Sequence, residues 1–580
     1  MNHQHLSMSS ARHKLLTAAL FGWTALSCYS GGRGKPPPPN TFYFPTGLAV
    51  SPDEAVLYAA NSDFDLQWNG GTLQSYDLGQ LRSDAALLIQ ANLSGAETPP
   101  SSIRFIGPST WHPNCQVSPP PPGVALGEAC SPPVDTAKYF HHSVTIGAFA
   151  NDAQISIAET QPAMVRRLFV PVGGDLSLTW ADVGAGADPN NPGDLFAIFC
   201  GQGSDGRCDA SHRVGNDPNQ AGDTRQLIMP DGPFGIAQTV DGTAIALTHE
   251  TAQATSLLST GLGGPWPGPP AMKFVLAGQE AGAGFVAPPA GGAGIAAVPH
   301  DSDGAKKPCE QVSDMPPCVR PAFLETYRSA AEIDLFRYYD DDGTGQPFIQ
   351  RESVFPLAAN APGTDSRGIV IDPTPSIACK AQGLLDPAAC AMQYPPRVFF
   401  ASRSPPALGI GHIGDFLGDT GTYDPDQLVI TGNVPLPSPT GAGPSKVYLA
   451  PIVNQGGQFE LRVFVLIFDA NQIAVYDPSA SGEAAMTLIN VGPGPSALAF
   501  DPFSLEDVGR HAMVGAPDTN RNRPYRFAYV ASFTQSYVQM IDLDDSQPTT
   551  ATFEQVVFTL GLPTLPVGQQ SQQQGPSGLL

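Results

Sequence analysis

The stretch V-G-P-G-P-S-A-L-A-F-D-P at residues 491–502, together with the two apolar runs that follow it, decides the fold of this chain. Those runs are F-A-Y-V-A-S-F at residues 527–533 and Y-V-Q-M-I-D-L at residues 537–543. Each run has the length of a strand, is rich in β-branched and aromatic residues, and is bounded by Gly, Pro, Asn or Asp. The close spacing of the last two predicts a hairpin, and F-E-Q-V-V-F-T-L-G at residues 553–561 supplies a fourth strand.

Four short antiparallel strands cannot bury both of their faces alone, so such units pack side by side as the blades of a β-propeller. Weaker copies of the pattern occur along the chain, and their second strands begin near residues 57, 168, 244, 323, 398, 463 and 527. The sequence therefore predicts an all-β protein, a β-propeller of seven four-stranded blades. The copies are longer than the roughly 40–50 residues of compact propeller repeats, which predicts long loop insertions stapled by disulfides.

The intermediate copies are less regular than the first and the last. The second is expected to begin with a strand at residues 144–150, to continue through 167–172 and 178–183, and to end with a strand at 224–229. The others are expected within residues 232–248, 295–339, 365–402 and 446–478.

The first copy carries a family resemblance. It reads F-P-T-G-L-A-V-S-P-D at residues 44–53, L-Y-A-A-N-S-D-F-D at 57–65 and G-G-T-L-Q-S-Y-D-L at 70–78. These residues resemble the YVTN-type repeat of lactonase-like and surface-layer seven-bladed propellers. The resemblance implies a fold and leaves the activity open.

The N-terminus has the pattern of a processing signal. Arg12 and Lys14 precede an apolar run at residues 15–26 that is too short to span a bilayer, which needs about 20 residues. The sequence A-L-S-C at residues 25–28 resembles the lipobox of bacterial lipoproteins, which implies lipidation of Cys28. The alternative is an ordinary cleaved signal peptide. We expect a lipoprotein signal peptide at 1–27.

The lipid anchor would place the protein at the bacterial cell envelope. Tyr29, which follows the lipid cysteine and is not Asp, favours the outer membrane. A Pro/Gly-rich tether at residues 28–40 should not pack on the propeller, because a proline run is extended. The propeller is expected at 41–566, followed at 567–580 by a low-complexity tail or a closing strand.

Eight further cysteines form four couples that are close in sequence, as expected for disulfides in an exported protein. Metal binding is the rival explanation, but no CxxC motif or paired His supplies tetrahedral spacing. The predicted pairs are Cys115–Cys130, Cys200–Cys208, Cys309–Cys318 and Cys379–Cys390. The first couple is expected between blades and the other three on connections that leave the blades at one end of the ring.

The chain carries a formal net charge of −24, which argues against nucleic acid or anionic lipid as its partner. The expected partners are the membrane, through the N-terminal lipid, and a protein or glycan. This partner should meet the end of the ring that carries the long insertions, because binding usually lies on loops held by a rigid scaffold.

Few residues suggest chemistry, and we predict neither a catalytic residue nor a cofactor. The GxGxxG match at residues 201–206 lies between Cys200 and Cys208 and is interpreted as a disulfide-closed turn rather than a dinucleotide site. Acidic turns could bind Ca²⁺ but lack a full ligand loop, so a metal site stays undecided. These turns are Asp301–Gly304, Asp340–Gly343 and the group Asp63, Asp65 and Asn69; the histidines His141, His142, His249 and His412 are expected to be structural.

The sequence therefore favours an exported, lipid-anchored binding or scaffolding module. The alternative is a propeller enzyme, a lactonase-like hydrolase with its site on the central axis, which would need polar side chains from several blades to converge there.

Overall fold

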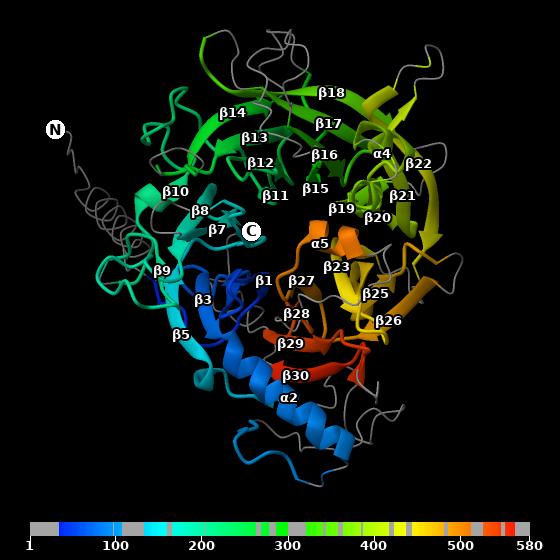
Figure 1. Ribbon diagram of the computed structural model, residues 1–580. Coiled ribbons are helices and arrows are strands. Elements are labelled where there is room, and N and C mark those ends of the chain that lie inside the picture. The colour runs from blue at the N-terminus through cyan, green and yellow to red at the C-terminus, as the bar shows by residue number, and fades with distance from the viewer. Residues whose placement is uncertain are drawn as a thin grey trace, which may run out of the picture.

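The computed structural model shows a ring of seven small antiparallel sheets (Figure 1). It describes residues 34–562 apart from 95, 97, 107–132, 159–164, 204, 263–267, 278–285, 300–320, 340–343, 358–363, 384, 386, 417–420, 422, 437–442, 481–484, 512–525 and 547–551. The predicted seven-bladed β-propeller is confirmed. None of the helices in the described part of the chain is long and apolar enough to cross a membrane.

Each blade is a meander whose first strand lies nearest the axis. Blade 1 contains β1 (Pro45–Val50), β2 (Val56–Asn61), β3 (Thr72–Asp77) and β5 (Phe140–Thr145). Blade 2 contains β6 (Gln154–Ile155), β7 (Arg166–Val172), β8 (Ser177–Val183) and an outer edge divided between β9 (Ile198–Phe199) and β10 (Arg213–Val214). Blade 3 contains β11 (Pro233–Gln238), β12 (Ala244–His249), β13 (Ala254–Ser259) and β14 (Ala271–Ala277).

The remaining blades follow the same order. Blade 4 contains β15 (Gly292–Ala297), β16 (Ala322–Tyr327), β17 (Glu332–Tyr339) and β18 (Phe348–Pro356). Blade 5 contains β19 (Thr364–Asp372), β20 (Arg397–Ser404), β21 (Pro406–Phe416) and β22 (Tyr423–Pro435). Blade 6 contains β23 (Pro444–Val453), β24 (Phe459–Ile467), β25 (Gln472–Tyr476) and β26 (Met486–Asn490). Blade 7 contains β27 (Pro495–Phe500), β28 (Phe527–Ser532), β29 (Tyr537–Asp542) and β30 (Val556–Leu560).

A repeated side-chain hydrogen bond explains the Ser, Thr or Asp that ends several first strands. Ser51 Oγ accepts from the N–H of Val56 at 2.9 Å, at the start of the second strand. Asp501 Oδ2 accepts from the N–H of Phe527 at 3.1 Å in the equivalent position of blade 7. These polar side chains therefore fix the turn from the first strand to the second.

The core lies between neighbouring sheets because successive side chains of a strand point to opposite faces. In β2, Leu57 and Ala59 are buried in the cluster shared with blade 7. Val56, Tyr58 and Ala60 of the same strand are buried in the cluster shared with blade 2. The aromatic residues of the second and third strands are thus core residues and form no exposed ligand platform.

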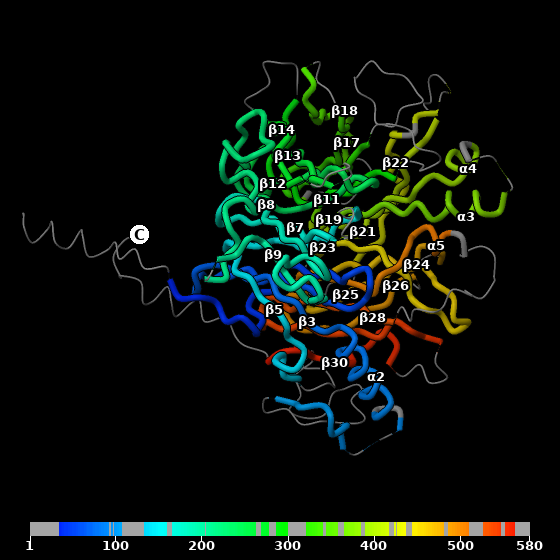
Figure 2. The backbone as a smooth tube through the Cα atoms, turned by 60° about the vertical axis from the view of Figure 1, so that its left-hand side comes forward, coloured from blue at the N-terminus to red at the C-terminus, as the bar shows by residue number. Residues whose placement is uncertain are grey.

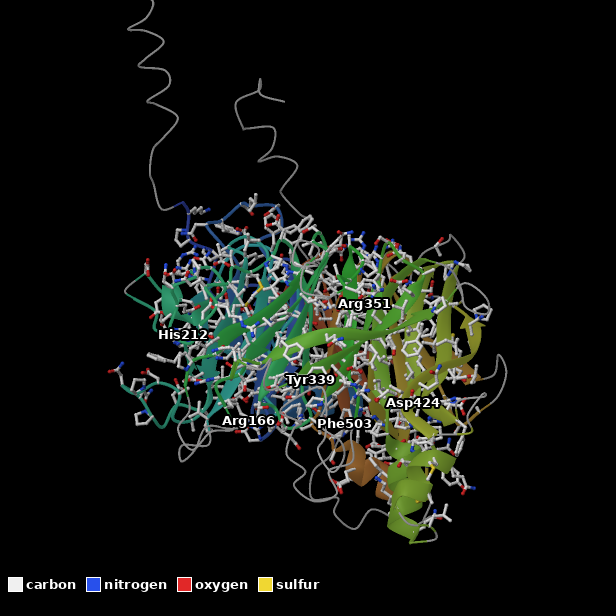
Figure 3. The ribbon with its side chains drawn as sticks, turned by 90° about the horizontal axis from the view of Figure 1, so that it is seen from above. Arg166, His212, Tyr339, Arg351, Asp424 and Phe503 are labelled. Atoms are coloured by element: carbon white, nitrogen blue, oxygen red, sulfur yellow. A yellow bond between two sulfur atoms is a disulfide. The ribbon has the colours of Figure 1, made fainter. Side chains whose placement is uncertain are left out.

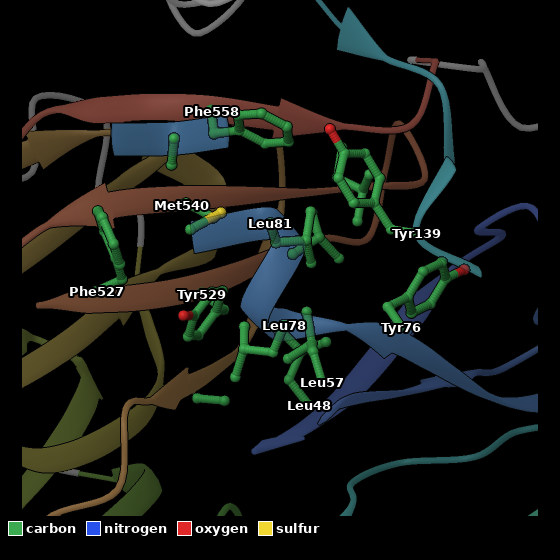
Figure 4. Packing of buried hydrophobic residues seen from close by; sticks show 14 of the residues in the cluster. Leu48, Leu57, Tyr76, Leu78, Leu81, Tyr139, Phe527, Tyr529, Met540 and Phe558 are labelled. Carbon is green, nitrogen blue, oxygen red and sulfur yellow. The ribbon is translucent and has the colours of Figure 1, made fainter. Parts of the chain in front are cut away.

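Helix α2 (Leu78–Ser94) closes the ring between blades 1 and 7. Its apolar residues recur at helical spacing and pack against the last blade (Figure 4). The helix contributes Leu78, Leu81, Ala85, Leu88 and Ile89, and blade 7 contributes Phe527, Tyr529, Met540 and Phe558. Strand β4 (Pro133–Val134), which precedes β5 in the chain, pairs in parallel with β30 and adds an edge to blade 7. Residues 567–580, where a closing strand was one expectation, lie outside the described residues.

The two ends of the ring differ in their connections. Connections between first and second strands, and between third and fourth, leave at one end, while the second-to-third hairpins and the links between blades leave at the other. The first end carries α2, α3 (Thr374–Gln382), α4 (Pro387–Gln393) and α5 (Leu505–His511). We call it the helical end and the other the hairpin end. Figure 2 shows α3, α4 and α5 on one side and the blue start of the described chain on the other, and Figure 3 shows Phe503 at the helical end.

Two helices meet across blade 6 at the helical end. Helix α3 belongs to the first connection of blade 5 and α5 to that of blade 7, and the two pack against each other. They approach closely at Gly509, where a Cβ would stand 2.8 Å from Ile377 Cβ. The insertions of blades 5 and 7 are thus in contact with each other at this end of the ring.

Two positional predictions are wrong. Residues 144–145 end β5, the fourth strand of blade 1, because the insertion that contains α2 separates β5 from β3. The fourth strand of blade 2 is β9 with β10, and residues 224–229 form no strand. Cys115 and Cys130 lie outside the described residues, so the expected place of this couple between blades stays a prediction.

The last part of the expected tether contacts the propeller, contrary to prediction. The Lys35 ammonium lies over the Trp68 ring, 4.4 Å from its centroid, and the Asn69 N–H donates to the Lys35 carbonyl at 2.9 Å. Gln74 Nε2 donates to the Pro39 carbonyl at 2.8 Å. A proline run lacks most N–H donors, but its carbonyls still accept, and blade 1 supplies the donors.

Candidate functional site

A cleft of about 430 Å³ opens at the helical end between blades 6 and 7. It lies among the loop 454–458 after β23, the connection after β25, and the connection between β29 and β30. Its lining residues are Ile452, Asn454, Gln455, Gly456, Glu460, Arg462, Val475, Asp477, Ala485, Thr487, Asp545, Phe553 and Glu554.

Among the described residues that line the cleft, Arg462 on β24 is the only cation. Its Nη2 lies 2.8 Å from Glu460 Oε2 and 3.2 Å from Asp477 Oδ2, and its side chain is largely buried. Its Nη1 donates to the Leu461 carbonyl at 2.9 Å. These partners hold the guanidinium in the wall of the cleft.

The lining carries more negative charge than Arg462 can balance. Glu460, Asp477, Asp545 and Glu554 contribute four carboxyl groups against one guanidinium. Burial raises the pKa of Glu554, and the nearby Asp545 raises it further, while a hydrogen bond with Thr487 and the charge of Arg462 lower it. A cationic group entering the cleft would relieve this excess of negative charge.

The backbone of the cleft is fixed by hydrogen bonds between the two blades. The Val453 N–H donates to the Leu543 carbonyl at 2.9 Å, and the Asp545 N–H donates to the Val453 carbonyl at 2.7 Å. Asn454 closes the neighbouring loop, since its Oδ1 accepts from the Gln458 N–H at 2.8 Å and its Nδ2 donates to Glu460 Oε1 at 2.6 Å. The carboxylates therefore sit on a preformed frame.

The central channel is crossed by Lys446 of β23. Its Nζ lies 3.4 Å from the Thr46 carbonyl in blade 1, 3.2 Å from the Asn151 carbonyl and 3.4 Å from Asp152 Oδ1 at the start of blade 2. The side chain thus reaches from blade 6 to blades 1 and 2, at the ends of the inner strands that face the hairpin end.

A second, smaller cavity of about 260 Å³ lies at the hairpin end. Arg328 lines it and forms ion pairs with Glu250 and, at 3.7 Å, with Asp365. Arg367 of β19 also pairs with Asp365. These charged groups of blades 3 to 5 neutralise one another in ion pairs. This cavity therefore carries a smaller excess of charge than the cleft.

Two predicted disulfides are present. Cys200–Cys208 and Cys379–Cys390 have Cα–Cα distances of 5.0 and 5.6 Å. The second joins α3 to α4 at the helical end, as predicted. Cys28, Cys115, Cys130, Cys309 and Cys318 lie outside the described residues, so the lipidation and the other two pairs stay predictions.

The predicted position of Cys200–Cys208 at the helical end is wrong. Its loop interrupts the outer edge of blade 2 between β9 and β10 and joins the outer strand of blade 1. The Thr145 N–H donates to the Gly206 carbonyl at 2.8 Å, and the Cys208 N–H donates to the Thr145 carbonyl at 3.0 Å. The GxGxxG match is a disulfide-closed turn, as predicted. Its hydrogen bonds with Thr145 connect blade 2 to blade 1.

The four histidines lie in strands, His141 and His142 in β5, His249 in β12 and His412 in β21. His141 stacks on Phe196 with ring centroids 3.6 Å apart, and burial lowers the pKa of His142. His249 Nε2 lies 2.8 Å from Ser256 Oγ, and burial lowers its pKa to about 4. His412, on β21, pairs with Arg397 in the register of its sheet.

In the hairpin after β2, Asp63 Oδ1 accepts from the Trp68 N–H at 3.1 Å, and Asp65 Oδ1 accepts from the Gln67 N–H at 3.2 Å. These carboxylates, with Asn69, order a turn. Within the described ranges no group of three or more His, Cys, Asp or Glu side chains is arranged to hold a metal ion. Asp301–Gly304 and Asp340–Gly343 lie outside those ranges.

Sequence reasoning missed most of the cleft. It placed long insertions at one end of the ring, but not the carboxylates of Asp477, Asp545 and Glu554. One signal was available: the third strands of blades 1, 6 and 7 end in or are followed by Asp77, Asp477 and Asp542, which places carboxylates at the helical end.

No family model and no curated protein matches the chain. Solved structures that resemble it include Kuenenia stuttgartiensis hydrazine synthase, with 10% identity, a TM-score of 0.39 and coverage of 89% of this chain and 99% of that chain. The periplasmic gluconolactonase of Pseudomonas aeruginosa has 14% identity, a TM-score of 0.35 and coverage of 70% and 86%. AztD from Citrobacter koseri has 10% identity, a TM-score of 0.29 and coverage of 72% and 82%. The propeller assignment depends on the strand pairing of this chain and not on these likenesses.

Proposed function

We propose that this protein is an exported, lipid-anchored β-propeller that acts as a binding module at the bacterial cell envelope. The anchor is a lipid on Cys28, and the membrane is the outer membrane. The binding site is the cleft between blades 6 and 7, and its occupant is a lysine or arginine side chain of a protein partner.

The observation that carries this proposal is the charge of the cleft. Four carboxyl groups and one guanidinium line a fixed concave surface, and the proximity of Asp545 to Glu554 disfavours both being ionised. A cation delivered by a partner would make charge-assisted hydrogen bonds with carboxylates that are already positioned.

The surroundings of the cleft fit a protein partner. The helical insertion of blade 5, at the same end of the ring, exposes the apolar side chains of Leu385, Met392 and Tyr394. These exposed apolar side chains lie at the same end of the ring as the cleft, on the face that we propose meets the partner.

The lactonase-like alternative, with a site on the central axis, is less well supported. Lys446 and its three oxygen partners occupy the channel near the hairpin end. Its ammonium is bound to groups of the protein itself.

The anchor is tested by Cys28→Ser. We expect the variant to fold and to leave the membrane fraction for the soluble one. Continued fractionation with the membrane would show that another feature retains the protein there.

The cleft is tested with the double variant Asp545→Asn, Glu554→Gln. Wild type and variant, with Cys28 intact, are compared by affinity capture from a detergent-solubilised envelope fraction. We expect the variant to lose the basic partners that wild type retains. The matched control is Glu506→Gln, Asp507→Asn on α5, which makes the same charge change at the same end of the ring and should retain them. Equal capture by all three proteins would contradict the assignment.

A further inference from the structure

An apolar patch covers part of the hairpin end. Phe64, in the hairpin after β2, is 56% exposed, and Leu66 in the same hairpin is 60% exposed. The Phe64 ring rests on three others, with centroid distances of 6.0 Å to Phe44, 5.8 Å to Phe149 and 5.4 Å to Phe533. Phe468 extends the group, 6.0 Å from Phe533. We call these six residues the phenylalanine patch.

The patch is assembled from four blades. Phe44 and Phe149 precede the inner strands of blades 1 and 2, while Phe468 and Phe533 lie in the second-to-third connections of blades 6 and 7. The packing of the blades does not require Phe64 and Leu66 to project into solvent. An exposed apolar patch of this kind marks a surface that contacts a partner or a membrane.

The described chain begins beside this patch. Lys35 stacks on Trp68, which lies in the same hairpin as Phe64 and Leu66. Trp68 in turn lies near Tyr43, with ring centroids 6.4 Å apart, and Tyr43 is adjacent in sequence to Phe44. The N-terminal segment therefore approaches the propeller at the hairpin end.

Chain length limits how far this end can lie from the membrane. Gly34 follows Cys28 by six residue steps, and a fully extended segment of that length spans at most about 20 Å. If Cys28 carries the lipid, Gly34 lies within this distance of the bilayer surface, and Asn69 of the same hairpin lies next to Gly34.

We infer that the phenylalanine patch contacts the bilayer surface and orients the propeller with its helical end away from the membrane. This inference rests on the proposed anchor at Cys28. The contact is apolar, which agrees with the net negative charge of the chain, because such a chain gains nothing from electrostatic attraction to anionic lipid. The cleft between blades 6 and 7 then faces partners at the far side.

The test uses tryptophan substitutions at two phenylalanines of similar exposure. Phe64→Trp places the reporter in the patch, and Phe416→Trp places it at the helical end, where Phe416 is 53% exposed at the end of β21. The mature, lipidated full-length proteins are reconstituted in vesicles of phosphatidylethanolamine and phosphatidylglycerol with or without brominated acyl chains. Fluorescence of wild type, with its natural tryptophans, is subtracted.

We expect bromine to quench the added fluorescence of Phe64→Trp and to leave that of Phe416→Trp unchanged. Quenching at Phe416→Trp alone, or at neither position in vesicle-bound protein, would overturn the inference while the anchor stands. Quenching at neither position would indicate that the patch contacts a protein partner instead of the bilayer. Failure of the wild type to associate with vesicles would instead overturn the anchor proposal, and this inference with it.

A second variant separates the patch from the anchor. Phe64→Ser, Leu66→Ser with Cys28 intact should remain vesicle-bound but lose the quenching of its natural Trp68. Unchanged quenching of Trp68 would contradict a role for the two side chains.

Discussion

Arg82 of α2 is paired with Asp501 of blade 7, with Arg82 Nε donating to Asp501 Oδ1 at 3.1 Å, so the helix inserted in the first blade is tied to the last blade. Arg82 also pairs with Glu54 at 2.9 Å, and the Tyr529 hydroxyl donates to Asp501 Oδ1 at 2.8 Å. Ring closure therefore depends on a buried charged network as well as on the apolar surface of α2.

Asp501→Ala should lower the free energy of unfolding by about 3–5 kcal/mol, the range for breaking a buried ion pair. The loss arises because Arg82 loses one carboxylate and the N–H groups of Arg526 and Phe527 lose their acceptor. The measurement is denaturant unfolding followed by fluorescence.

Asp469→Ala is the control for this prediction. It removes an ion pair with Arg403 whose side chains are 31% and 40% exposed, and a surface pair contributes about 0–1 kcal/mol. Equal losses for both variants would contradict a special role of Arg82 and Asp501 in closure.

Gly409→Ala in β21 should destabilise blade 5 by about 1–3 kcal/mol, the usual cost of overpacking. A Cβ at Gly409 would stand 2.1 Å from Phe400 Cζ, in the adjacent strand. Gly432 lies in the same sheet, and a Cβ there would meet nothing within 4 Å. Gly432→Ala should therefore be neutral or slightly stabilising. Thermal unfolding of the two variants, side by side, checks the difference.

Asp63→Asn should change how stability depends on pH. Burial raises the pKa of Asp63 to about 7, so the folded protein retains a proton that the unfolded chain releases near pH 4. Stability of wild type relative to the variant is then highest below pH 4. It falls by up to about 1.4 kcal/mol per pH unit as pH rises towards 7.

Asn suits this position because the backbone has a φ of 49°, a region that Asn adopts readily. Unfolding free energies of both proteins between pH 4 and pH 8 provide the measurement. Parallel pH profiles would mean that Asp63 is ionised in the folded protein throughout this range.

The blades could be predicted from sequence because local composition decides a strand. All seven second strands were located, since β2, β7, β12, β16, β20, β24 and β28 are dense in β-branched, aromatic or small apolar residues. The fourth strands were harder. β5 follows β3 only after the insertion that contains α2, and β9 with β10 are two residues each, divided by the loop of Cys200–Cys208. An outer strand of two residues, whose place in the sheet depends on pairing with neighbouring segments, is too short to show a strand pattern in a single sequence.

The cleft and the axis could not be predicted because they join distant blades. Arg462 and Glu554 come together only when blades 6 and 7 pack, and the sequence around Lys446, K-V-Y-L-A-P, indicates a strand but not a side chain crossing the channel. The contact of Lys35 with Trp68 was missed for a different reason. A proline-rich segment predicts an extended chain, but not whether a neighbouring surface accepts it.

The most direct test of the account is site-specific photo-crosslinking in intact cells, with a photoreactive amino acid at Gln455 in the lip of the cleft or at Val240 on the first-to-second connection of blade 3. Val240 is exposed at the same end of the ring, away from the cleft. The account predicts a protein adduct at Gln455 that disappears when Asp545→Asn and Glu554→Gln are combined with the probe, and no such adduct at Val240. An adduct of the same mass at both positions, or one at Gln455 that survives removal of the two charges, would contradict it.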